Sequence, residues 1–402
     1  MHFFIKRIIN VDKTLWFLSV ISLPLLMIRE FRPLGIPLTQ IFLILSMIIN
    51  VKVIVLRKFY SIEISFIYLY IFFIAISFLD LLRDAGGNEN LYVFKLTLLF
   101  LSLIGYVTLI EKYGYSFFIK YLILSSTFLL LILIYKSLFV LNTNWLAIHP
   151  SIPTRSGKNQ LAFFLSFILP LLIWNYVNYK KFFINKWFYI AFIIIHFFSA
   201  LFVQSRGLLF SFVISLLITS LVYKNILIVN IKRILIFAVV CISGFYLVVS
   251  LKLIDLTYFI QKVKSVFGGN DNQISTKIRK ELITESLDIF MQNPIFGIGT
   301  NNFAETIGKA THNTYLQITA ENGILGIFII LSFLILLFIK MLHYREKSPI
   351  YYTSVHIYWN LVVYLFVING FFNVISVVGI SIIILFERYK LGIKSNVGFS
   401  ND

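Results

Sequence analysis

The chain has 402 residues, of which 59% are hydrophobic and only 13% are charged, and its mean hydropathy is +0.90. Soluble domains contain roughly 45–50% apolar and about 25% charged residues, so this composition excludes a soluble globular protein. A net charge of +18 would suggest a nucleic-acid partner in a soluble protein. Here no nucleic acid is expected, because the cytoplasmic loops of membrane proteins are rich in Lys and Arg.

Long apolar runs predict an all-α integral membrane protein with about twelve transmembrane helices, because each crossing takes about 20 residues. The alternating pattern of a membrane β-barrel is not seen, so helices are the expected spanning elements. In chain order the predicted spans are 14–28, 34–55, 62–82, 91–110, 117–140, 160–178, 187–203, 207–223, 234–251, 312–339, 350–368 and 371–386.

The loops on one side of these spans hold most of the basic residues, and this bias predicts that both termini are cytoplasmic. It divides the chain into a membrane domain with spans one to nine (residues 1–251), one large outside loop before the tenth span (252–311), and a membrane domain with spans ten to twelve and a cytoplasmic tail (312–402).

The predicted outside loop contains one amphipathic segment. Apolar residues recur at helical spacing from Ile274 onward, which predicts a helix over 274–292 that Asn293-Pro294 ends. The following Gly297-Ile298-Gly299 is typical of a turn that lets another stretch of backbone approach closely.

Polar and charged side chains gather on the predicted outer side of the membrane. They are Arg155, Lys158 and Asn159 before the sixth span, Arg206 between two spans, Arg279 on the amphipathic helix, and His312 with Glu321 at the tenth span. Arg suits phosphate oxygens, and a His can act as a general base toward a hydroxyl. The structural alternatives are headgroup anchoring for Arg206, solvated charges for Arg155, Lys158 and Arg279, and a polar helix cap for His312.

Glu321 lies more than two turns inside an apolar helix, and an ionisable group at that depth is a functional hypothesis by default. No metal or cofactor is expected, because the sequence lacks an Asp-rich motif and His312 has no second ligand at i+3 or i+4.

Four blocks of the chain resemble the O-antigen ligase and O-antigen polymerase superfamily of bacterial envelope glycosyltransferases. The first two blocks are His312-Asn313-Thr314-Tyr315-Leu316 running into Glu321-Asn322-Gly323-Ile324-Leu325-Gly326, and Asn293-Pro294-Ile295-Phe296-Gly297-Ile298-Gly299-Thr300-Asn301-Asn302-Phe303. Ser205-Arg206-Gly207 and Gly157-Lys158-Asn159-Gln160-Leu161-Ala162 are the other two. One departure is Ile283 after Leu282, where the family often has Trp.

The resemblance implies a fold of about twelve helices in a bacterial inner membrane, with one large periplasmic loop before the helix that bears His312 and an active site that faces the periplasm. It also implies glycosyl transfer from a polyprenyl-diphosphate-linked donor without a metal or a nucleotide sugar. It implies that Arg206 and Arg279 bind the donor diphosphate, that His312 activates the acceptor hydroxyl and that Glu321 supports the site. Arg155, Lys158, Asn159 and Asn313 are candidates for further substrate contacts.

Two enzymes of this superfamily differ in their acceptor. A polymerase joins undecaprenyl-diphosphate-linked repeat units into O-antigen or a similar polymer, whereas a ligase transfers the glycan to lipid A-core. The short link between Phe303 and His312 favours the polymerase, with the ligase as the alternative. A polytopic transporter or flippase is the third functional hypothesis. Membrane lipid and a chain-length regulator are the partners expected besides the substrates.

Overall fold

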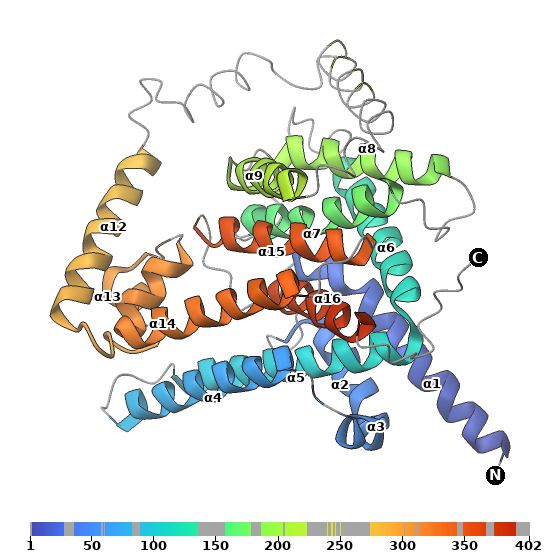
Figure 1. Ribbon diagram of the computed structural model, residues 1–402, viewed down its shortest axis with the longest axis horizontal. Helices are drawn as coiled ribbons and strands as arrows, with labels where there is room; N and C mark the ends of the chain where they lie inside the picture. Colours follow the sequence, from blue (N-terminus) through green and yellow to red (C-terminus); the bar gives the residue numbers. More distant parts are fainter. Residues whose placement is uncertain are drawn as a thin grey trace.

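A computed structural model describes the greater part of the chain as helix, with no strand among the described residues (Figure 1). The described residues are 2–27, 36–57, 59, 61–82, 89–135, 157–177, 186–203, 206–222, 239, 243, 246, 250, 274–300, 302–309, 311, 313–343, 349–366 and 374–390. The predicted ninth span, 234–251, lies almost wholly outside them.

The first half of the described chain forms helices α1 (His2–Ile21), the 3-10 helix η1 (Leu23–Met27), α2 (Leu38–Ile49), α3 (Val51–Leu56), α4 (Ser61–Leu82), α5 (Glu89–Tyr113), α6 (Tyr115–Tyr135) and α7 (Gly157–Val177). The second half forms α8 (Lys186–Val203), α9 (Arg206–Val222), α12 (Ile274–Gln292), α13 (Phe303–Ile307), α14 (Thr314–His343), α15 (Pro349–Tyr364) and α16 (Val374–Lys390).

Three described helices are long and apolar enough to cross a membrane, over Val93–Tyr113, Tyr115–Tyr135 and Thr314–His343. They coincide with three of the predicted spans and confirm the prediction of an all-helical membrane protein. Six shorter apolar helices lie within other predicted spans. The full set of twelve crossings and their sidedness stay predictions.

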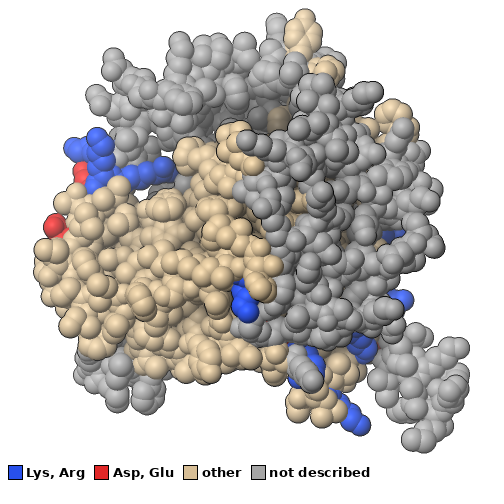
Figure 2. Space-filling view, viewed as in Figure 1, with Lys and Arg blue, Asp and Glu red and all other residues tan. Residues whose placement is uncertain are grey.

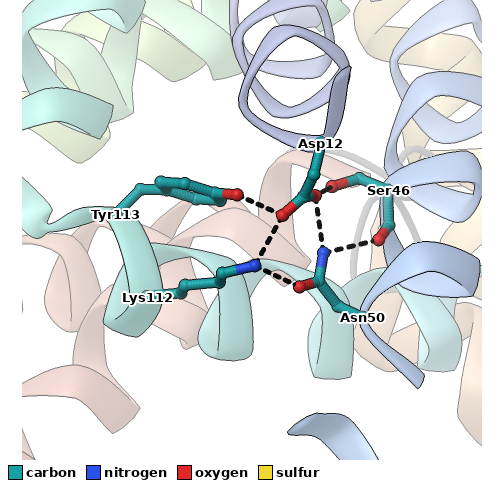
Figure 3. A network of polar contacts seen from close by, with 5 residues as sticks. All are labelled: Asp12, Ser46, Asn50, Lys112 and Tyr113. Atoms are coloured by element: carbon teal, nitrogen blue, oxygen red, sulfur yellow. Dashed lines mark hydrogen bonds and ion pairs between the residues drawn. The ribbon is translucent and has the colours of Figure 1, made fainter. Parts of the chain in front are cut away.

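The span predicted over 34–55 is not one helix. The helical conformation is interrupted at Asn50, which separates α2 from α3. Asn50 donates its amide N–H groups to Asp12 Oδ1 at 2.5 Å and to the carbonyl of Ser46 at 2.7 Å (Figure 3). The twelve residues of α2 measure about 18 Å, well short of the roughly 30 Å of a bilayer core.

Two antiparallel helices, α7 and α15, occupy the centre of the bundle (Figure 1). Phe163 stacks on Tyr364 with ring centroids 4.7 Å apart, and at the other end Trp174 donates to His356 Nδ1 at 3.0 Å. Both helices are buried on nearly every side, which is expected of helices that are surrounded by others. They bring the start of α7 and the end of α15 to the same end of the bundle.

The described surface carries charge in only a few places. In Figure 2, Lys and Arg side chains gather over α12 and toward the lower and right-hand margins, and the broad surface below α12 carries almost none. On α14 the exposed side chains Ile324, Phe328, Leu331, Ile335 and Ile339 follow one another at steps of three and four residues. An exposed apolar stripe of this kind marks a surface for contact with membrane lipid or with another protein.

Candidate functional site at the break in helix α14

Helix α14 contains a break at Gly323, which has φ 61° and ψ −156°. A residue with a side chain rarely adopts this positive φ, whereas glycine adopts it without steric cost. The prediction of one continuous helix over 312–339 is therefore corrected: α14 consists of two helical segments that meet at Gly323. The break exposes backbone groups that a regular helix would pair internally.

The turn that follows α12 satisfies these backbone groups. The amides of Ile298 and Gly299 donate to the carbonyls of Ala320 and Glu321 at 3.0 and 2.9 Å. In return, the amide of Ile324 donates to the carbonyl of Pro294 at 2.8 Å. Residues 293–300, hereafter the clamp turn, thus bind the carbonyl end of the first helical segment and the amide end of the second.

Glycines on both sides let the two stretches of backbone come this close. A Cβ atom on Gly297 would lie 2.3 Å from the backbone of Glu321, and a Cβ atom on Gly323 would lie 2.3 Å from the carbonyl oxygen of Ile295. Both distances are too short for any side chain. The sequence-based prediction that the Gly297–Gly299 turn permits close backbone approach is confirmed.

The clamp turn holds Glu321 in a buried position beside the break. Glu321 is 3% exposed, and its Oε1 accepts a hydrogen bond of 2.8 Å from the Gln317 amide one turn earlier. The next residue, Asn322, donates to the hydroxyl of Thr300 in the clamp turn at 2.8 Å, and both side chains are buried. Sequence reasoning missed Gln317 and Thr300, because neither residue type at these positions signals a role on its own.

Asn313 caps the N-terminus of α14. Its Oδ1 accepts the backbone N–H of Leu316 at 3.1 Å, three residues later, which is the geometry of an N-cap. Thr311 Oγ1 in turn donates to the carbonyl of Asn313 at 2.8 Å. Asn313 therefore has a structural role as well as its predicted place among the substrate contacts. His312 immediately precedes this cap and lies outside the described residues.

Helix α12 has the bounds predicted for the amphipathic helix, and its apolar face packs on the clamp region. Leu282, Phe303 and Ala320 form a small core, and Ala320 directly precedes Glu321. Arg279 is exposed and lies one turn before Leu282, so both residues lie on the same side of α12. The structure thereby joins the helix that bears Arg279 to the helix that bears Glu321.

The end of α15 links the start of α14 to the start of α7. The amide of Thr314 donates to the carbonyl of Leu365 at 2.9 Å, and Tyr364 stacks on Phe163 of α7. Lys158 and Asn159 belong to the first turn of α7, five and four residues before Phe163. Asn313 and this first turn therefore lie at the same end of the bundle.

The remaining predicted site residues are placed only in part. Arg206 is the first residue of α9, and the side chains of Arg206, Lys158 and Asn159 are outside the described atoms. Arg155 lies outside the described residues. Within the described part of the chain, no three His, Cys, Asp or Glu side chains come together as metal ligands.

A family model supports the resemblance seen in the sequence. The O-antigen ligase family (Wzy_C) matches residues 189–331, a segment that contains α9, α12, the clamp turn and the break in α14. No curated protein matches the chain. Members of this family are glycosyltransferase-like membrane enzymes with a lipid-linked glycan substrate. Residues 189–331 thus match the O-antigen ligase family, and this match supports the similarity of the chain to the O-antigen ligase and polymerase superfamily.

Proposed function

We propose that this protein is a glycosyltransferase of the bacterial inner membrane that joins undecaprenyl-diphosphate-linked repeat units into O-antigen or a similar surface polysaccharide. The observation that carries the proposal is the clamped break in α14. It keeps a carboxyl group, 3% exposed, inside a membrane-spanning helix within the segment that matches O-antigen ligase. Ionisable groups kept at such a cost are normally functional.

The donor diphosphate is assigned to Arg206 and Arg279. A guanidinium presents paired N–H groups that match phosphate oxygens, and it can stabilise the charge of a departing diphosphate without a metal. The packing of Leu282 on Ala320 supports the placement of Arg279 in this site, because it fixes α12 against α14. Arg155, Lys158 and Asn159 would add contacts to the glycan from the start of α7.

His312 is assigned as the general base. The acceptor hydroxyl loses its proton to the imidazole while its oxygen bonds to the anomeric carbon of the donor sugar. The bond from that carbon to the diphosphate oxygen breaks, and undecaprenyl diphosphate leaves. Glu321 supports the site from the helix that follows His312, and Gln317 holds its carboxyl group in place.

The short chain between the clamp turn and α14 favours the polymerase. Only the five-residue helix α13 and a few further residues join the two, and Phe303 of α13 is fully buried. This leaves little added structure with which to admit a lipid A-core. The O-antigen ligase is the second candidate, because the matching family model bears that description. The same match favours an enzyme over a transporter.

The proposal includes the topology drawn from charge: about twelve crossings, both termini in the cytoplasm, residues 252–311 in the periplasm and the reaction at the periplasmic face. A regulator of chain length is the protein partner that a polymerase of this kind would need.

The test is the surface-glycan profile of a strain that lacks the gene, separated on a gel. A lipid A-core that carries a single repeat unit means that ligation survives and polymerisation is lost, as we expect. Bare core with long glycan left on the polyprenyl carrier would identify the ligase instead. An unchanged profile would contradict both assignments.

The residue assignments are tested in the same strain by complementation. His312→Ala and Arg206→Ala should each abolish polymer at normal protein abundance, and Arg279→Lys should lose most activity because it keeps the charge without the paired donors. Lys309→Ala, an exposed position between α13 and α14, is the matched control and should retain polymer. Wild-type glycan from the His312 or Arg206 variant would remove that residue from the mechanism.

A further inference from the structure

The surface formed by α1 and α6 combines lysines with aromatic rings, on the side of the molecule opposite α12 and α13 (Figure 1). The rings of Phe117 and Tyr121 on α6 lie 4.6 Å apart, and Phe17 of α1 packs edge-on against Tyr121 at 4.9 Å. The Lys13 amine lies 5.9 Å from the centre of the Phe117 ring, and the Lys120 amine lies 5.8 Å from that of Tyr121. We call these five residues the α1–α6 surface.

The position of α1 at this surface is fixed by a buried polar network (Figure 3). The Asp12 carboxylate is 1% exposed and accepts hydrogen bonds from Ser46, Asn50 and Tyr113. Its Oδ2 atom also forms an ion pair with Lys112 Nζ at 2.6 Å. With Asp12 held inside, the next residue, Lys13, is exposed at the surface. The network therefore sets the rotation of α1.

The charges at this surface are sorted by sign. The two described acidic residues nearby, Asp12 and Glu111, are both buried, and α6 has no acidic residue. Lys13 is exposed and Lys120 is partly exposed. The α1–α6 surface thus presents positive charge without an exposed carboxylate among its described residues to neutralise it.

An apolar stripe continues from this basic end along α6. Phe117, Tyr121, Leu124, Phe128 and Leu131 follow one another at steps of four and three residues, so they share one face of the helix. Leu124, Phe128 and Leu131 are exposed by 36%, 67% and 47%. The ten residue steps from Tyr121 to Leu131 rise about 15 Å, which is about half of a bilayer core.

We propose that the α1–α6 surface binds an anionic phospholipid. Its phosphate lies between Lys13 and Lys120, and one acyl chain lies along Leu124, Phe128 and Leu131. Lysines at the headgroup level attract anionic lipids, and aromatic rings are favoured at the same depth. Cationic heads above an apolar stripe one leaflet long match a phospholipid in both charge and length. The site is separate from the proposed glycan chemistry and does not depend on it.

The test is native mass spectrometry of the full-length protein, purified in detergent and titrated with phosphatidylglycerol or phosphatidylcholine. We expect phosphatidylglycerol to bind more tightly, and the double variant Lys13→Gln with Lys120→Gln to raise its apparent Kd about tenfold. The double variant Lys13→Arg with Lys120→Arg should keep the preference. Phe128→Ala should weaken both lipids and leave the preference unchanged.

The matched control is Lys277→Gln with Lys280→Gln, which removes two exposed charges from α12. It should bind phosphatidylglycerol like the wild type. Equal binding of the two lipids by the wild type, or an equal loss in this control, would overturn the proposal. Displacement of phosphatidylglycerol by a lower concentration of undecaprenyl phosphate would also overturn it and assign the site to a polyprenyl carrier.

Discussion

Glu321 and Asp12 are two of the four carboxyl groups that are buried among the described residues, together with Glu63 and Glu111. Glu321 has Gln317 as a hydrogen-bond donor and lies beside the break in α14. Asp12 has four side-chain partners, which are Ser46 on α2, Asn50 at the junction of α2 and α3, and Lys112 and Tyr113 on α5. A buried carboxyl group is costly unless polar partners surround it, so the partners of each are as informative as the acid itself.

Removal of the Gln317 donor should impair the reaction without unfolding the protein. The loss of a hydrogen bond to a buried group costs about 1–3 kcal/mol, so Gln317→Leu should lower the rate of glycan transfer by about 10–100-fold. Glu321→Gln should lower it at least as far. The rate is measured with purified protein and a lipid-linked donor over a range of pH.

The control is Thr319→Val, two residues further along the same helix, whose hydroxyl bonds only to the carbonyl of Tyr315 among its described partners. It should retain most of the rate. If Gln317→Leu behaves like this control and keeps the wild-type pH profile, Gln317 does not position the carboxyl group.

The Asp12 network should contribute stability that depends on pH. Burial raises the pKa of Asp12, but the hydrogen bonds from Lys112, Tyr113, Ser46 and Asn50 outweigh it, so the pKa of the folded state lies below the ordinary 3.8. The stability is therefore fully present above pH 3.8 and is lost as the pH falls through the lower folded pKa.

At neutral pH, Asp12→Asn should destabilise the protein by about 2 kcal/mol, because charge-assisted hydrogen bonds are lost. The measurement is thermal unfolding in detergent at pH values from 7 downward. The gap between wild type and variant should narrow at the acid end. A gap that widens toward acid would mean that Asp12 has a raised pKa.

At the scale of elements, glycines decide how the clamp turn and α14 fit together. Gly297 and Gly323 combine positive φ with a neighbouring backbone only 2.3 Å from where a Cβ atom would lie. Gly308, at the end of α13, has φ 72° with no atom within 4 Å of that position. A side chain at Gly308 would therefore meet only backbone strain, whereas a side chain at Gly297 or Gly323 would meet both strain and a steric clash.

Gly297→Ala and Gly323→Ala should each abolish polymer, because the clamp turn must move away from Glu321. Gly308→Ala adds only backbone strain, about 1 kcal/mol, and should leave polymer visible. The readouts are glycan on a gel and protein abundance in the membrane. Normal polymer from Gly323→Ala would show that the break does not require glycine.

At the scale of the whole molecule, the charge bias predicts opposite sides of the membrane for α12 and the C-terminus. With the only cysteine removed by Cys241→Ser, Lys280→Cys should react with a membrane-impermeant thiol reagent in intact cells. Lys394→Cys should react only after the inner membrane is opened. Labelling of both in intact cells would contradict the predicted topology.

The sequence by itself determined the class of protein and much of its local structure. Apolar runs of bilayer length indicated an all-helical membrane protein, and helical periodicity together with Asn293-Pro294 predicted α12 with its observed bounds. These features follow from composition and short-range spacing, which the chain carries whatever its tertiary contacts. The candidate site was found from chemistry-bearing residues, and two of them, Glu321 and Arg279, lie on helices that the structure joins.

Only the tertiary structure decided where the helices break and what holds the breaks. Gly323 and Gly326 are each followed by Ile in the same apolar run, so the sequence does not distinguish them. Within α14, only Gly323 leaves the helical conformation. The reason is that the clamp turn, more than twenty residues earlier, supplies the hydrogen bonds that the helix loses there. Asn50 likewise ends α2 while its side chain bonds to Asp12 of α1. Long-range hydrogen bonds of this kind leave no periodic signal in the sequence, because each partner is an ordinary polar or glycine residue until the fold brings the two together.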